Sequence, residues 1–223
     1  MRKRKLGRTD LRVSELCIDA TGFGWTLGAD AAFATLDAFR DAGGNFIQFN
    51  ARAEVDAADP AATSVAESIV GRWFRARAVP RGDFVLTSCL QLPAPHAGWS
   101  YLRIATAIRE HCERILQRLQ SPYLDLLLLR WTESLPVDET LVAIESLLRA
   151  GQFRHLGCCA FPAWRTMEWN GHAARRQLSR LAAAQIEVPF AHDLGSWREC
   201  LDLAREQSLG LVVRPPFQTC GTS

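Results

Sequence analysis

Three side chains that could do chemistry lie in, or at the end of, short apolar runs: Gln48, Cys89 and Arg130. An arginine can hold a carboxylate or a phosphate through two parallel hydrogen bonds. A thiol beside a guanidinium can have a lowered pKa and act as a nucleophile. The alternative is that Arg130 pairs with a local acid such as Glu133 and that Cys89 is inert packing.

Other residue types that often carry chemistry show no pattern of a site. The seven cysteines are odd in number and lack ligand spacing, which indicates a reducing cytosol and buried thiols; they are residues 17, 89, 112, 158, 159, 200 and 220. Cys158 and Cys159 are adjacent and would point to opposite sides of a strand, so we predict no metal site. Among the five histidines, His111 and His172 fall in helical patterns and His155 at the entry to a strand.

The elements that must position these residues alternate along the whole chain. Apolar runs typical of strands occur near residues 15–20, 45–49, 84–90, 124–130, 154–160, 185–190 and 210–214. Amphipathic helical patterns fill the gaps near residues 30–42, 63–76, 100–119, 137–150, 164–182 and 196–207. Strands that alternate with helices of this length indicate a parallel sheet built from right-handed βαβ units.

Several segments, in this order and spacing, resemble the aldo-keto reductases. The matching segments are the hairpin-like opening 4–14, Glu67-Ser-Ile-Val-Gly-Arg72, Tyr123-Leu-Asp-Leu-Leu-Leu-Leu129, Val137-Asp-Glu-Thr-Leu141, Gly151-Gln-Phe-Arg-His-Leu-Gly157, Gln185-Ile-Glu187 and Leu211-Val-Val-Arg-Pro-Pro-Phe217. The resemblance implies an α/β fold of the (β/α)8 TIM-barrel type. We therefore expect one domain over residues 1–223, with a β-hairpin at 4–14 and β/α units over 15–217.

The number of predicted units is smaller than a closed barrel requires. We count about seven strands and six helices in this sequence, and a closed barrel has eight of each. The unpaired edges of such a sheet invite pairing with another chain. We therefore expect self-association or a protein partner at the open barrel edge, unless the sequence is a truncated or frame-disrupted copy. The surfaces expected to be partly uncovered are the apolar sides of the first helix (Phe33, Leu36, Phe39) and the sixth (Trp197, Leu201, Ala204).

The resemblance also identifies positions where catalytic residues would stand. The family uses an Asp, a Tyr, a Lys and a His: the Tyr is the acid at the carbonyl oxygen, the Lys lowers its pKa, the Asp pairs with the Lys, and the His orients the carbonyl. Here these positions hold Gln48, Ala53, Cys89 and Arg130, so no member of the tetrad is retained. General acid catalysis of the family's kind is therefore expected to be absent.

The residues that the resemblance places against the cofactor are only partly retained. Gly22 and Trp25 match the first cofactor-side loop, Gln185 matches a retained glutamine that helps hold the nicotinamide amide, and Arg214 replaces an aromatic that often stacks on the nicotinamide. A Ser-Asn pair that binds the carboxamide is replaced by Cys159–Ala160. NADP binding is possible by resemblance, and we expect it to be weak or absent.

Composition restricts the remaining classes of function. A formal net charge of +2 gives no reason to expect a nucleic-acid partner, and no apolar run reaches the ~18 residues of a membrane helix. The resemblance, with its replaced tetrad, implies an aldo-keto-reductase-like protein that is inactive as an NADPH-dependent carbonyl reductase, a pseudoenzyme or degenerate paralogue, and the scattered cysteines indicate a cytoplasmic location. The alternatives are an active NADP-dependent oxidoreductase with a rearranged site and a partner subunit that docks through the open barrel edge.

Overall fold

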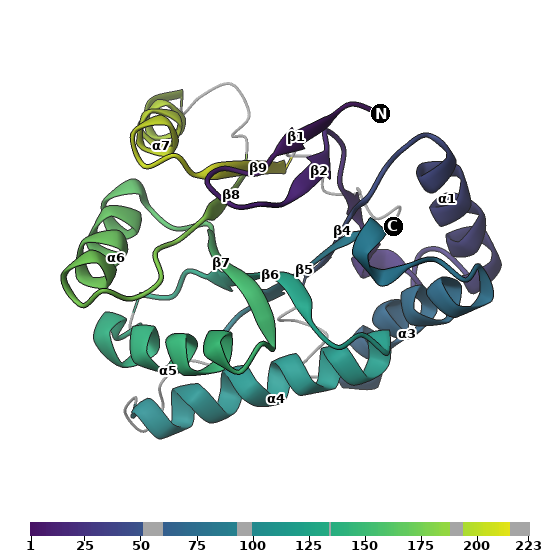
Figure 1. Cartoon of the computed structure of the whole chain (residues 1–223), viewed down its shortest axis with the longest axis horizontal. Helices are drawn as coiled ribbons and strands as arrows, with labels where there is room; N and C mark the ends of the chain where they lie inside the picture. Colours follow the sequence, from purple (N-terminus) through teal and green to yellow (C-terminus); the bar gives the residue numbers. More distant parts are fainter. Residues whose placement is uncertain (51–59, 93–99, 134, 188–193, 215–223) are drawn as a thin grey trace, which may run out of the picture.

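A curled parallel sheet forms the centre of the computed structural model, which describes residues 1–50, 60–92, 100–133, 135–187 and 194–214 (Figure 1). Seven strands follow one another in chain order in this sheet: β3 (Ile18–Asp19), β4 (Phe46–Asn50), β5 (Val85–Leu90), β6 (Leu124–Arg130), β7 (Phe153–Cys159), β8 (Ala183–Glu187) and β9 (Gly210–Arg214). Every neighbouring pair in this sheet is parallel. The predicted TIM-barrel-type architecture is confirmed, as a partial barrel.

Six α-helices lie on the outer face of this sheet in the described part of the chain (Figure 1). They are α1 (Ala29–Asp41), α3 (Pro60–Ala76), α4 (Tyr101–Leu119), α5 (Val137–Arg149), α6 (Ala163–Arg175) and α7 (Leu194–Glu206). Two 3-10 turns, η1 (Ala20–Gly22) and η2 (Arg81–Asp83), join strands to their neighbours. A separate antiparallel pair, β1 (Lys3–Lys5) and β2 (Arg12–Ser14), is the predicted N-terminal hairpin.

Strand β6 shows why the sheet has two buried faces. Leu126 and Leu128 point into the barrel, where they pack with the hairpin residues Leu6 and Leu11. Leu127 and its neighbours of the same parity point outward into the core between the sheet and the helices. A strand that is buried on both faces needs a continuous apolar run, and the sequence from Leu124 to Leu129 supplies one interrupted only by Asp125.

Two predicted helix boundaries were wrong. The pattern near 164–182 predicted one helix, but α6 ends at Arg175 because Gln177 takes the left-handed conformation, with φ of 56°. Buried Leu181 continues the apolar pattern beyond this end without being helical. Helix α3 begins three residues earlier than predicted, at Pro60, and proline is well suited to the first position of a helix because its φ is already helical.

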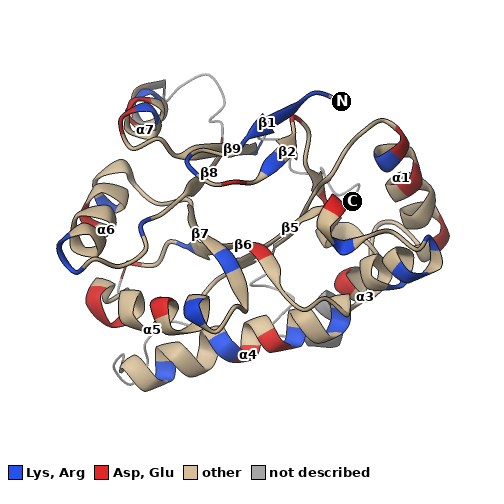
Figure 2. Cartoon of the chain, viewed as in Figure 1, with Lys and Arg blue, Asp and Glu red and all other residues tan. Residues whose placement is uncertain are grey.

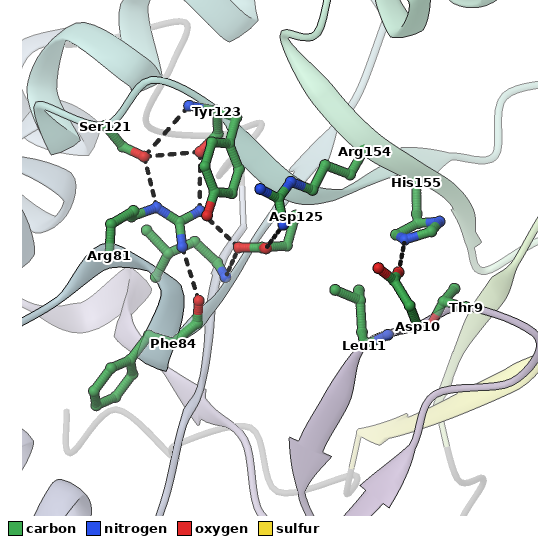
Figure 3. Close-up of polar contacts among 11 residues, drawn as sticks. Thr9, Asp10, Leu11, Arg81, Phe84, Ser121, Tyr123, Asp125, Arg154 and His155 are labelled. Carbon is green, nitrogen blue, oxygen red and sulfur yellow. Dashed lines mark hydrogen bonds and ion pairs between the residues drawn. The ribbon is translucent and has the colours of Figure 1, made fainter.

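The hairpin closes the N-terminal end of the barrel and is fixed there by polar contacts. The side chain of Asn45 accepts a hydrogen bond from the Ser14 backbone N–H at 2.7 Å and donates one to the Arg12 carbonyl at 2.9 Å. His155 Nε2, at the start of β7, lies 2.8 Å from the carboxylate of Asp10 in the hairpin loop (Figure 3). Strand β7 and the hairpin are therefore joined although they are far apart in sequence.

Arg81 is the centre of a second polar cluster, at the N-terminal end of β6 (Figure 3). Its guanidinium donates hydrogen bonds to Asp125 at 2.6 Å, to Ser121 Oγ at 2.6 Å and to the Tyr123 carbonyl at 2.9 Å. Two guanidinium groups pack against the Tyr123 ring. The ring centroid lies 4.3 Å from the guanidinium carbon Cζ of Arg81 and 3.8 Å from that of Arg154. A buried carboxylate is thereby matched with a fixed cation.

The two edges of the described sheet are β3 and β9. The expected exposure of the first helix was wrong for Leu36 and Phe39, which are buried because α1 packs on α3. In α7, Ala204 is buried as well, while Trp197 and Leu201 are half-buried. On the edge strand itself, Val213 is 48% exposed and is the largest apolar side chain left open there.

Charges of both signs are interspersed along the outer helices, and β1 is basic throughout (Figure 2). Two of the basic side chains near the N-terminus, Arg2 and Arg4, pair with Glu15. Within the described residues, none of the helices combines the length and the apolar character that a membrane span requires.

Candidate functional site

The carboxyl ends of the seven strands meet at one end of the barrel, which we call the barrel mouth. Barrel enzymes place their chemistry at this end because the loops that follow the strands converge there. The side chains at the last residue of a strand, or one or two residues before it, include Asp19, Gln48, Cys89, Arg130, Cys159, Gln185, Glu187 and Arg214. The structure thus brings five of the sequence-predicted residues to one end: Gln48, Cys89, Arg130, Gln185 and Arg214.

Gln48 and Gln185 face each other across the interior of the barrel. The Gln48 side-chain nitrogen donates to the Gln185 side-chain oxygen at 2.8 Å, and both residues are 3% exposed. A buried amide needs hydrogen-bond partners, because leaving it unpaired costs about 1–3 kcal/mol. Gln48, which stands at the family's Asp position, therefore already donates a hydrogen bond to the side-chain oxygen of Gln185. Gln185 is the residue that the resemblance assigns to the cofactor.

Two thiols and a guanidinium form the second group at the mouth. Arg130 Nη1 lies 3.9 Å from Cys159 Sγ, because the ends of β6 and β7 pair Arg130 with Cys159. The Cys89 side chain packs in the same interior cluster as Cys159. No ion pair joins Arg130 to Glu133 among the described residues, so the local pairing considered from the sequence is not the one formed.

The pKa of these two thiols moves in opposite directions. The pKa of Cys89 is raised well above 9.0, because its proton is held in the hydrogen bond to Cys159 and because burial disfavours the charged form. The pKa of Cys159 is lowered, because it accepts that hydrogen bond and lies beside Arg130. The hypothesis of an activated Cys89 was therefore wrong: the thiol in contact with the guanidinium is Cys159, two strands away.

Arg214 links three strand ends on the open side of the mouth. Its guanidinium lies 3.6 Å from the Asp19 carboxylate on β3 and 3.9 Å from the Glu187 carboxylate on β8. The sequence analysis did not identify either acid. The signal that could have found them is their place late in two predicted strands, near residues 15–20 and 185–190. In the structure Asp19 ends β3 and Glu187 ends β8, as Arg214 ends β9.

The remaining sequence-predicted residues lie away from these contacts or outside the described part. The Gly22 carbonyl accepts the backbone N–H groups of Trp25 at 3.1 Å and Thr26 at 2.9 Å, which closes the turn after η1. The Trp25 side chain is 63% exposed. Ala53 lies outside the described residues. The cofactor contacts of Gly22, Trp25, Gln185 and Arg214 stay predictions.

A serine–histidine contact lies elsewhere, between the sheet and helix α4. Ser88 Oγ is 2.9 Å from His111 Nε2. The pKa of His111 is lowered to about 4, mainly by burial and also by the charges of Arg114 and Arg118. Ser88 is 1% exposed and follows the outward-facing positions of β5, so this pair belongs to the helix–sheet core rather than to the mouth.

This histidine predicts an acid-sensitive stability. A folded-state pKa near 4 lies below the unfolded value near 6.5, so the neutral form favours folding above pH 6.5, and that contribution is lost as pH falls toward 4. We expect up to about 3 kcal/mol of unfolding free energy to be lost through His111 between pH 7 and 4.5. Urea unfolding of the wild type and of His111→Gln at both pH values measures it. Equal losses in the two proteins would show that His111 is not responsible.

Two observations limit other kinds of site. Among the described residues, no three His, Cys, Asp or Glu side chains are grouped as a metal ion would require. A surface cavity of about 320 Å³ lies at the opposite end of the barrel and is lined by Lys3, Arg40, Arg77 and Asp83 among others. Its two arginines already pair with Asp37, so their charges are already matched within the protein.

Comparison with known proteins gives consistent matches. The model of the aldo/keto reductase family matches residues 16–222. The chain is 31% identical over 217 residues to the uncharacterized oxidoreductase YrpG of Bacillus subtilis, covering 95% of this chain and 65% of that protein. It is 29% identical over 218 residues to norsolorinic acid reductase B of Aspergillus parasiticus, covering 90% and 54%. The chain thus spans between about half and two thirds of the length of these relatives.

Proposed function

The chain belongs to the aldo/keto reductase family, and from what stands at its barrel mouth we propose that it does not catalyse the family's tyrosine-dependent carbonyl reduction. In this reading the protein is a pseudoenzyme or a degenerate paralogue with an aldo-keto-reductase-like barrel. The observation that carries the proposal is that the four tetrad positions hold Gln48, Ala53, Cys89 and Arg130, and the described three make contacts unlike those of a tetrad.

Each described replacement lacks a property that the reduction requires. Hydride transfer to a carbonyl needs a group that can give up a proton near the operating pH. Gln48 has no proton to give and no charge to hold a lysine. Arg130 puts a guanidinium where the family has the imidazole that orients the carbonyl. Cys89 is buried and its pKa is raised, so it is a poor acid and supplies no positive charge.

We also propose that NADP binding is weak or absent. Gln185, the residue assigned to the nicotinamide amide by resemblance, already accepts a hydrogen bond from Gln48. Arg214 stands where an aromatic often stacks and is held by Asp19 and Glu187. A cofactor would have to break these contacts, including the hydrogen bond between two buried amides.

A titration tests the cofactor proposal. Quenching of tryptophan fluorescence by added NADPH should show no saturable phase below about 1 mM, the upper end of typical enzyme constants. Gln48→Ala removes both the hydrogen bond to Gln185 and the volume of the side chain, whereas Gln48→Met removes the hydrogen bond and keeps the volume, so the two variants separate the effect of the hydrogen bond from that of volume. Saturable binding to the wild type at micromolar NADPH would overturn the proposal.

A second candidate is an active oxidoreductase with a rearranged site. The names of the relatives favour it, since one is described as an oxidoreductase and another as a norsolorinic acid reductase. Arg130 could polarise a bound carbonyl or hold a carboxylate in this case. Micromolar NADPH binding together with consumption of NADPH would support this candidate over the first.

We further propose self-association, or docking of a protein partner, at the open edge formed by β9. Its outward side chains include Val213, which is 48% exposed, and Leu211, which is half-buried. An unpaired strand edge offers free backbone donors and acceptors to another chain. Sedimentation at low micromolar concentration should show a dimer or larger species that Val213→Lys reduces, and a monomer for the wild type would contradict this.

The free described cysteines support a cytoplasmic location.

A further inference from the structure

Among the described cysteines, Cys159 is distinguished by a direct contact between its sulfur and a guanidinium. Its sulfur lies 3.9 Å from the Arg130 guanidinium, and it shares an interior cluster with the Cys89 thiol. Arg214, also at the mouth, adds a second favourable charge, which Glu187 opposes in part. A thiolate at this position would lie beside the Arg130 guanidinium, and a neighbouring cation is one of the features that lower the pKa of reactive cysteines.

We propose that Cys159 is a modification site, a peroxide-reactive thiol at the barrel mouth, and that Arg130 and Cys89 are its positioning residues. The reaction is oxidation to a sulfenic acid by hydrogen peroxide or an organic hydroperoxide. This inference does not rest on the proposed loss of reductase activity, because it involves neither NADPH nor a carbonyl substrate.

The chemical step uses only the thiol and the hydroperoxide. The Cys159 sulfur attacks one peroxide oxygen, so that an S–O bond forms while the O–O bond breaks. With hydrogen peroxide, the leaving hydroxide takes the proton released by the thiol and departs as water. The sulfur is oxidised by two electrons and the peroxide is reduced by two. Arg130 stabilises the thiolate before the attack, and the Cys89 S–H donates to it.

The adjacent Cys158 is a control that the protein itself provides. Cys158 and Cys159 are 1% and 3% exposed, so they differ little in access. Cys158 points to the other face of β7, into the helix–sheet core, where its pKa is raised to about 12 by burial. A difference in reaction rate between these neighbours therefore reports the surroundings of the sulfur and not its place in the chain.

The expected rate difference is large. The pKa of Cys159 lies below the ordinary value of 9.0, and that of Cys158 is about 12. The thiolate fractions at neutral pH then differ by about 1,000-fold or more, and the lower intrinsic nucleophilicity of the less basic thiolate reduces the rate ratio to roughly 30-fold. Exposure alone predicts a different order, in which the half-exposed Cys17 and Cys200 react first.

The test is a peptide map of the full chain after brief treatment with hydrogen peroxide and dimedone, which traps sulfenic acids. A disulfide between Cys159 and Cys89 is counted together with the adduct, because a sulfenic acid can condense with a neighbouring thiol. We expect Cys159 to be modified about 30-fold faster than Cys158, and faster than Cys17 and Cys200. Modification that follows exposure, or equal rates at Cys158 and Cys159, would overturn the proposal.

Variants separate positioning from a structural role. Arg130→Gln should move the midpoint of the Cys159 rate–pH profile upward and slow the reaction at neutral pH about 10-fold, whereas Arg130→Lys should restore most of the rate. Cys89→Ala should act in the same direction as Arg130→Gln, and Cys158→Ser should have no effect. An unchanged profile in Arg130→Gln would contradict the role of Arg130. If Arg130→Gln does not fold, the rate–pH profile of Arg130→Lys is compared with that of the wild type. The ratio of the Cys159 rate to the Cys158 rate in the wild type still tests the proposal.

Discussion

Replacing Arg81 with alanine is expected to lower the free energy of unfolding by about 3–5 kcal/mol, because it leaves a buried carboxylate without its cation. The side chain of Asp125 is only 4% exposed and lies 2.6 Å from the Arg81 guanidinium (Figure 3). After the substitution, its near contacts are the Leu86 backbone N–H at 2.9 Å and Arg154 at 4.0 Å. Urea unfolding of wild type and variant measures the difference.

An exposed ion pair provides the matched control. Arg114 lies 3.5 Å from Glu110 on the surface of α4, and both side chains are more than half exposed. Arg114→Ala should cost less than about 0.5 kcal/mol, as isolated surface pairs on helices do. If Arg81→Ala costs no more than Arg114→Ala, the cluster around Asp125 does not stabilise the barrel in the way described.

The second large effect is expected for Trp73→Ala, at about 3–5 kcal/mol of unfolding free energy. Trp73 on α3 is fully buried, with ring centroids 5.2 Å from Phe74 and 5.4 Å from Phe84. Its indole nitrogen also donates to Asp37 of α1 at 2.9 Å, so the substitution removes both packing and a link between helices.

Trp164→Ala is the comparison for this substitution, because the Trp164 side chain is 61% exposed. The substitution removes its edge contact with Trp131, at a centroid distance of 6.0 Å. Because the side chain is mostly exposed, the free energy of unfolding should fall by about 1 kcal/mol. Thermal or urea unfolding of both variants gives the two values. Similar losses in the two variants would show that α3 does not contribute the core described here.

The fold could be predicted from the sequence where a strand or a helix carries its own complete signal. Strand β6 was predicted at 124–130 and has those bounds, because burial on both faces requires a nearly continuous apolar run, which here is interrupted only by Asp125. Helix α4 was predicted near 100–119, and the predicted start is confirmed: Ser100 accepts a hydrogen bond from the Arg103 N–H. The end of α6 was missed, because the left-handed conformation of Gln177 leaves no mark in the apolar pattern.

The candidate site could be predicted only in part, because its contacts depend on the register of neighbouring strands. The types of Gln48, Cys89 and Arg130 and their place at strand ends were readable from the sequence. Their partners were not, because pairing of Arg130 with Cys159 follows from the alignment of β6 with β7. The contact between Gln48 and Gln185 joins residues 137 positions apart and requires the curvature of the whole sheet.

The most direct test of the account is a steady-state assay of NADPH consumption. The purified chain is incubated with NADPH and a panel of aldehydes and quinones, beside an aldo/keto reductase that carries the full tetrad. We predict that the absorbance of NADPH declines no faster than in the mixture without protein, because Gln48, Cys89 and Arg130 supply no proton at the carbonyl oxygen. Steady, protein-dependent oxidation of NADPH with any of these substrates would contradict the account.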